Sequence, residues 1–421
     1  GYHARHRLNE VWEVRQKARY LHVNVDYQTV APDTFNAATG DVTRYVWSSP
    51  DILNQFTIDN QVEARFEVGP TFHVALFGVD YSHSIDKFSY HYGPAASINV
   101  NNVIYTGATV PEPYQRTRQT LQQTGAYIQD QISIYDSLIL TLGGRFSYVE
   151  QETEDRMTGA SESKNDDAFT GRVGLTYLFD NGLAPYASYS TSFLPVAGTD
   201  FEDNALDPTT AKQWEVGIKY QPTFVDALFT LAYFDITQKD VVTTVNPITR
   251  YQTGEVHSRG IELEAKVALD DRTNLTGAFT YTDAEVREGV GVDVGDAPVA
   301  IPDFTASLWA DHRFDDNLLG GVLDGVTIGG GVRYVGESVG GYSPNAFTAG
   351  ADRLDVPGYT LFDAVVKYDF GVIDRRLEGL SARVNVTNLT DEDYYLAGYR
   401  SGHFLYMGDE RRATLTLTGR F

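Results

Sequence analysis

Cysteine is absent from this chain of 421 residues, so no disulfide can staple its loops. Positive charge is scarce as well, because 33 lysines and arginines face 57 acidic residues and give a formal net charge of −24. A nucleic-acid partner would require a basic face, and the composition therefore argues against one. The acidity needs no partner of its own, since a net charge far from zero also serves solubility.

Long apolar runs are missing too. No stretch approaches the roughly 20 apolar residues of a membrane helix. A membrane protein is not thereby excluded, because a transmembrane strand needs only about 10 residues, half of them polar. The mean hydropathy of −0.28 fits a membrane barrel as well as a soluble protein. The chain starts on Gly1 without a signal peptide, so we expect that its natural beginning has been cut away.

A strand pattern at the end of the chain is the most informative feature that is present. From Arg412 to Phe421, small or apolar residues alternate strictly with threonine and arginine. A period of two with one apolar and one polar face is typical of a half-buried strand. A strand that ends in phenylalanine, with nothing after it, indicates an outer-membrane β-barrel.

The same alternation recurs along the whole chain, for example over residues 138–148, 214–220, 261–269, 326–334 and 362–370. One face of each segment is apolar and the other carries charge, as expected for lipid outside and a wet or plugged lumen inside. Short turns alternate with long loops, which we place at 32–49, 91–115, 155–165, 194–209, 239–248, 289–302, 338–356 and 391–408. We count about 17 strands, an odd number, which again suggests a missing beginning. We expect one domain over residues 1–421.

Particular motifs resemble the TonB-dependent siderophore receptors, especially the ferrichrome-type branch. The matching segments are 123–131, 142–145, 177–182, 185–190, 192–193, 215–220, 259–262, 281–285, 302, 307–311, 384–389, 394–395, 408, 410–411 and 421. The resemblance implies a barrel of 22 strands whose lumen is filled by an N-terminal plug. This chain is similar to roughly strands 6 to 22 of that barrel, so the plug and the first strands are expected to be absent from it.

The resemblance also implies where a ligand would bind. Tyr92, at the outer end of a strand, and Tyr406, in the last long loop, line up with aromatic ligand contacts of the ferrichrome-type receptors. With the neighbouring Tyr90 and Phe88 they form the predicted siderophore-binding set. The alternative is that these residues belong to the aromatic belt at the membrane interface. Residues 399–405 stand where the ferrichrome receptor has a cysteine pair, which leaves the siderophore itself undetermined.

Neither a metal site nor a catalytic site is indicated. The histidines lack the tight spacing and clustered carboxylates of a dedicated metal site. Nucleophile-elbow, P-loop and zinc signatures are also absent. We therefore expect no enzyme activity, no cofactor and no protein-bound metal, with iron carried only as the ferric-siderophore ligand.

The favoured hypothesis is an outer-membrane TonB-dependent receptor of a Gram-negative bacterium that imports ferric siderophores of hydroxamate type. Its expected partners are the ferric siderophore, the TonB complex through the missing plug segment, outer-membrane lipid and lipopolysaccharide, and the receptor is expected to be a monomer. The alternatives are a receptor for another metal chelate or cobalamin, a passive porin, and an outer-membrane barrel enzyme of lipase or protease type.

Overall fold

The computed structural model describes residues 1–200, 205–246, 249–289, 291–314, 321–343, 350–399 and 404–420. Seventeen strands belong to one antiparallel sheet, and two further pairs form small hairpins. Within the described residues no helix is long and apolar enough to cross a membrane. The predicted all-β fold with about 17 strands in its main sheet is thus confirmed.

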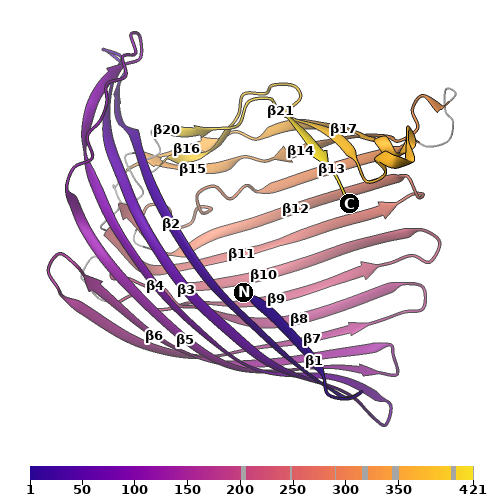
Figure 1. Cartoon of the computed structure of the whole chain (residues 1–421). Helices are drawn as coiled ribbons and strands as arrows, with labels where there is room; N and C mark the ends of the chain where they lie inside the picture. The colour runs from indigo at the N-terminus through magenta and orange to yellow at the C-terminus, as the bar shows by residue number, and fades with distance from the viewer. Residues whose placement is uncertain are drawn as a thin grey trace. The chain divides into compact units, whose positions relative to one another are not determined.

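The chain divides into two compact units. The first unit comprises Gly1–Gly174, Ser190–Lys212 and Lys239–Thr253. In it β1 to β6 pair in chain order, and β2 to β6 run side by side as the dark ribbons of Figure 1. Its strands are β1 (Tyr2–Arg7), β2 (Trp12–Asn36), β3 (Asp41–Val68), β4 (Thr71–Asn99), β5 (Pro113–Ile134), β6 (Leu138–Asp155) and most of β7 (Ser161–Tyr177).

The strands β2 to β5 are 22 to 29 residues long, more than twice what a membrane crossing requires. The predicted long loop at 32–49 is therefore wrong, because β2 and β3 remain paired up to Asn36 and Asp41. The predicted loop at 91–115 likewise shrinks to residues 100–112. Continued pairing satisfies the backbone N–H and C=O groups, and it also buries Tyr45 and Val46.

The register gives the first unit one polar and one apolar face. Asp59 lies opposite Asp80, and Tyr127 lies opposite Arg145, all on the polar face. The apolar face carries side chains that are 37% to 50% exposed, namely Val62, Phe77, Ile128 and Phe146. Uncovered apolar side chains in such a continuous row are what a lipid-facing surface requires.

Tyr81 and Tyr148 mark the end of this apolar row. Beyond them the same face carries Lys87, Glu150 and Glu152, which belong in water or headgroups rather than in hydrocarbon. The parts of β3 to β6 beyond these two tyrosines therefore lie outside the membrane-spanning segment.

Two glycines on the polar face make room for large neighbours. A Cβ atom at Gly78 would collide with the Tyr127 ring, and one at Gly125 with the Arg145 guanidinium. Freed by Gly125, Arg145 forms a forked ion pair with Asp80, with N–O distances of 2.5 and 2.9 Å. This pairing ties β6 to β4 across β5.

The second unit comprises Leu175–Tyr189, Gln213–Gln238 and Gly254–Phe421. In it β11 to β14 pair in order, followed by β17, β18 and β21. Its elements, some shared with the first unit, are β8 (Leu183–Leu194), β9 (Thr209–Tyr220), β10 (Asp226–Asn246), β11 (Thr249–Ala268), β12 (Thr273–Glu288), β13 (Phe304–Arg313), β14 (Val326–Val335), β17 (Tyr359–Asp369), η2 (Phe370–Val372), η3 (Arg375–Leu377), β18 (Ser381–Thr387) and β21 (Arg412–Thr418). Two hairpins are inserted, β15 (Ser338–Ser343) with β16 (Asp352–Val356), and β19 (Tyr395–Tyr399) with β20 (Phe404–Met407).

The predicted closing strand is present as β21. Leu415 and Leu417 on its apolar face are 65% and 68% exposed, whereas Thr414, Thr416 and Thr418 lie on the other face. Phe421, on which that prediction also depended, lies outside the described residues.

Candidate functional site

Five aromatic side chains form a patch on the polar face of β3 and β4, above the membrane-spanning segment. We call Tyr45, Trp47, Phe88, Tyr90 and Tyr92 the aromatic patch. Their ring centroids lie 5.0 Å apart for Tyr45 and Tyr92, 5.5 Å for Trp47 and Tyr90, and 4.8 Å for Phe88 and Tyr90. The rings are tilted against one another, which is a favourable arrangement for aromatic pairs.

Strand register explains why the rings meet. Trp47 lies directly opposite Tyr92 in the antiparallel pair of β3 and β4. Because side chains alternate between faces, Tyr45 joins Trp47, and Phe88 and Tyr90 join Tyr92. The structure thus brings together three of the four residues predicted to bind the siderophore.

Tyr45 and Trp47 escaped the sequence analysis because both fell in a segment predicted to be a loop. The missed signal was the alternation Tyr45, Trp47, Ser49, Asp51, which continues the strand pattern of β3. Tyr45 is 4% exposed and supports the patch, whereas Tyr92 is 43% exposed and offers surface to a ligand.

A pair of carboxyl groups borders the aromatic patch. Asp51 lies opposite Phe88, and Asp86 is two residues before Phe88 on the same face of β4. Asp51 lies seven residues beyond Ile58, the partner of Tyr81, and is therefore outside the membrane-spanning segment. Burial and the neighbouring Asp86 raise the pKa of Asp51 to about 6, and burial raises the pKa of Asp86 as well. The pair will thus hold a proton in mildly acidic solution.

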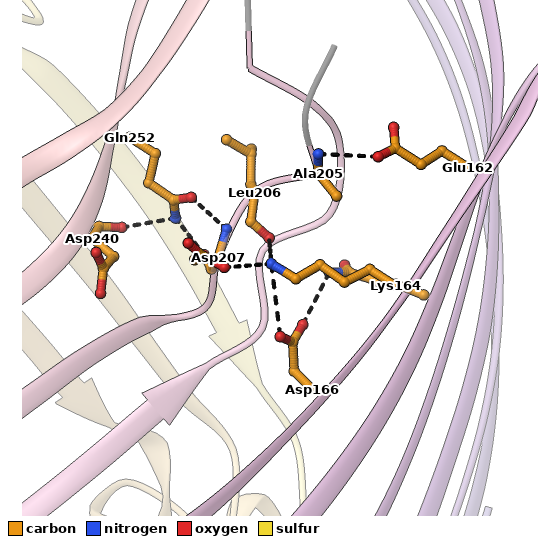
Figure 2. Close-up of polar contacts among 9 residues, drawn as sticks. Glu162, Lys164, Asp166, Ala205, Leu206, Asp207, Asp240 and Gln252 are labelled. Carbon is orange, nitrogen blue, oxygen red and sulfur yellow. Dashed lines mark hydrogen bonds and ion pairs between the residues drawn. The ribbon is translucent and has the colours of Figure 1, made fainter. Parts of the chain in front are cut away.

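The connection between β8 and β9 is docked on the polar face of β7. Figure 2 shows Lys164 reaching from β7 to this connection, where its Nζ donates to the Leu206 carbonyl at 3.0 Å and to Asp207 Oδ1 at 2.5 Å. Glu162 Oε1 accepts a hydrogen bond from the backbone N–H of Ala205 at 3.1 Å. Leu206 is only 1% exposed, so the connection is packed as well as hydrogen-bonded.

A glutamine fixes the same connection from another strand. Gln252 on β11 accepts from the Asp207 N–H and donates to the Asp207 carbonyl, imitating a backbone strand partner (Figure 2). Its Nε2 also donates to the Asp240 carbonyl at 3.0 Å. We call Lys164, Asp207 and Gln252 the loop latch.

The fourth predicted residue, Tyr406, belongs to the second unit. It lies on β20, the short strand that pairs with β19, and is 53% exposed. The base of this hairpin is closed by Tyr394, whose carbonyl accepts from the Gly408 N–H at 2.8 Å. The Tyr394 ring lies tilted against that of Tyr359, with 4.4 Å between the ring centroids. His403 lies outside the described residues.

Metal ligands are not assembled anywhere in the part of the chain that the structure describes, where no group of three or more His, Asp and Glu residues is suitable to hold an ion. The features that stand out are therefore an aromatic surface, a carboxyl pair and a docked connection, and they suit the binding of a bulky ligand better than chemistry on one.

Comparisons with known proteins agree with this assessment. The model of the family described as TonB dependent receptor-like, beta-barrel, matches residues 1–389. The chain is 37% identical over 418 residues to the ferrioxamine B receptor of Salmonella typhimurium, covering 98% of this chain and 56% of the relative. It is 33% identical over 450 residues to the ferrichrome outer membrane transporter/phage receptor of Escherichia coli, covering 100% and 58%.

Solved structures show the same fold. The siderophore receptor PiuA from Acinetobacter baumannii superimposes with a TM-score of 0.84 at 21% identity, covering 99% of this chain and 63% of that structure. The chain therefore spans somewhat more than half the length of the relatives that it matches.

Proposed function

Since the chain belongs to the TonB-dependent receptor β-barrel family, we propose that it forms most of the wall of an outer-membrane receptor that imports a ferric siderophore of the hydroxamate type. Relatives that are 32% to 37% identical to this chain are named for ferrioxamine B, ferrioxamine and ferrichrome. Membership of a family of receptors also confirms the prediction that the chain is not an enzyme, and its place is the outer membrane of a Gram-negative bacterium.

The aromatic patch is the observation that carries the ligand-binding part of the proposal. A ferric hydroxamate chelate is large and presents methylene and amide groups on its outside. Trp47 and Tyr92 offer flat apolar surface to the methylenes, and the Tyr92 hydroxyl can hydrogen-bond to the amides. We propose that Phe88 and Tyr90 complete this surface and that Tyr406 contributes from its own hairpin.

The remaining partners follow from the family and from the two faces of the sheet. We propose that TonB acts through a plug segment, that lipid and lipopolysaccharide cover the apolar face, and that the receptor works as a monomer. Iron arrives already chelated, so the receptor needs neither a cofactor nor a metal site of its own.

Uptake of radiolabelled iron tests the proposal. A receptor-deficient strain expressing the full-length gene is supplied with ferrioxamine B, ferrichrome or a catecholate chelate. We expect uptake of a hydroxamate chelate that stops when the proton-motive force is dissipated. Energy-independent entry of all three chelates would instead indicate a porin.

The site itself is tested with Trp47→Ala and Tyr92→Ala. Each removes an aromatic contact worth about 1.4 kcal/mol and should weaken ligand binding roughly tenfold. Tyr148→Ala, on the opposite face of the sheet, is the matched control and should bind as the wild type does. Unchanged affinity in both patch variants would exclude the patch as the binding surface.

A further inference from the structure

Three positively charged side chains share a small hollow in the second unit. Lys367 lies near the end of β17, Arg383 near the start of β18, and Arg420 just after β21. The hollow has a volume of about 290 Å³, and Ser381, Thr416 and Thr418 line it as well. We call it the cationic pocket.

The cationic pocket opens on the polar face. Its residues alternate with Val366, Val384 and Leu417, which belong to the exposed apolar face. It lies beside the connection of residues 370–380, at the end of the sheet opposite the inserted hairpins. With long loops outside the cell, this end is the periplasmic one.

Within the described residues, the three positive charges of the pocket are balanced only in part. Lys367 is directly opposite Arg383 in the register of β17 and β18, an arrangement that costs stability because like charges repel. Among the described residues, none of the three cations has an ion pair within 4.0 Å. The one acid of the pocket, Asp369, uses Oδ1 to accept from the Gly371 N–H at 3.0 Å.

Elsewhere on the same strands the charges are matched. Arg333 on β14 forms a forked ion pair with Asp363 on β17, at 2.7 and 3.1 Å. In a chain with 57 acids and 33 lysines and arginines, a hollow lined by three cations and a single acid runs against the average composition. This concentration of positive charge is best explained by a ligand that supplies the missing negative charge.

The donors in the pocket specify what that ligand is. Arg383 is paired in register with Thr416, and Ser381 with Thr418, so hydroxyl groups stand beside the guanidinium. Guanidinium, ammonium and hydroxyl groups together suit the oxygens of a phosphate or carboxylate. The phosphate of a membrane lipid is not a candidate. Lipid would contact the apolar face, which carries Leu415 and Leu417, whereas the pocket opens on the polar face.

We propose that the cationic pocket is an oxyanion-binding site at the periplasmic end of the wall. The oxyanion is either free phosphate or a carboxylate from a part of the full-length protein outside residues 1–421. This inference is independent of the proposed function, because it concerns neither the siderophore nor its uptake.

Thermal unfolding of the purified full-length receptor in detergent tests the proposal. Sodium phosphate is titrated against sodium chloride at equal ionic strength, so that general screening cancels. A bound anion raises the midpoint, and its concentration dependence gives an apparent dissociation constant. Arg383→Gln and Lys367→Gln should weaken phosphate binding roughly tenfold, the effect of one lost charge-assisted hydrogen bond. Arg412→Gln, on β21 but outside the pocket, is the matched control.

The same variants distinguish the two sources of the oxyanion. If a carboxylate of the protein already fills the pocket, phosphate has no effect on the wild type and Arg383→Gln lowers the midpoint, because an ion pair is lost. If free phosphate is the ligand, phosphate raises the midpoint of the wild type and of Arg412→Gln but not of Arg383→Gln. The proposal is overturned if phosphate has no effect and Arg383→Gln leaves the midpoint unchanged or raises it by relieving repulsion from Lys367.

Discussion

Replacing Gly125 by alanine should break the ion pair between Arg145 and Asp80, although Gly125 is not a member of that pair. The added Cβ would occupy the place of the Arg145 guanidinium, and Arg145 would have to release Asp80. Both side chains are partly buried, at 30% and 23% exposure, so the charge-assisted fork is worth about 2 kcal/mol rather than the larger value of a fully buried pair. We expect Gly125→Ala to lower the free energy of unfolding by about that amount.

The matched control is Gly277→Ala, in the middle of β12. A Cβ there would meet its nearest neighbour, Leu308, at an ordinary 3.5 Å. Since glycine is unfavourable in a strand, this change should be neutral or stabilise by about 0.5 kcal/mol. The measurement is guanidinium unfolding of the full-length protein in phospholipid bilayers.

A double-mutant cycle isolates the cause. In an Arg145→Ala background the collision partner is gone, so Gly125→Ala should cost nothing further and the coupling energy should be about 2 kcal/mol. Additive effects of the two substitutions, or equal effects of Gly125→Ala and Gly277→Ala, would refute the explanation.

Two further predictions concern the first unit. Lys164→Met removes the charge that holds Leu206 and Asp207, so amides of the connection between β8 and β9 should exchange hydrogen faster, while Lys212→Met, an exposed control, should not change them. Because the pKa of Asp51 is raised in the folded state to about 6 from 3.8, its contribution favours folding at low pH and is lost as pH rises from about 4 to 6. Asp51→Asn should therefore gain thermal stability relative to the wild type across that range and keep a constant advantage above it; an advantage independent of pH would contradict this assignment.

The faces of the strands could be predicted from the sequence because they depend on local alternation alone. Ile261 and Leu263 were assigned to the apolar side of one strand, and they are 43% and 44% exposed in the structure. Their neighbour Glu262 was assigned to the other side. Period-two alternation is sufficient for such predictions, since it requires no knowledge of which strand lies next door.

The extent of the strands could not be predicted in the same way. Residues 32–49 contain Pro32, Asp33 and Gly40, which favour a loop when considered alone. Pairing of β2 with β3 overrides that local preference, and only the turn at residues 37–40 remains. The error affected the aromatic patch most, because Tyr45 and Trp47 lie within the misassigned segment.

The cationic pocket could not be predicted from the sequence either. Lys367, Arg383 and Arg420 are separated by 16 and 37 positions. The first two are ordinary polar residues of alternating strands, and Arg420 follows directly after another strand. Only the register of β17, β18 and β21 places them in one hollow. Long-range register is the information that a single sequence carries least clearly.

Glycines in three of the motifs that resemble the family are explained by packing. Gly217 and Gly260 lie in two of these motifs, and a Cβ at either position would press on the ring of Tyr186 or Phe234. In another motif, the Arg145 guanidinium occupies the space beside Gly125 in the same manner. Each large side chain can lie over its glycine only in one register, so such pairs fix how neighbouring strands align. The aromatic patch lies outside the membrane-spanning segment, where Trp47 is paired with Tyr92. A sequence resemblance that includes these glycines therefore carries information about the fold and the strand register, whereas the residues of the aromatic patch are brought together only by the pairing of β3 with β4.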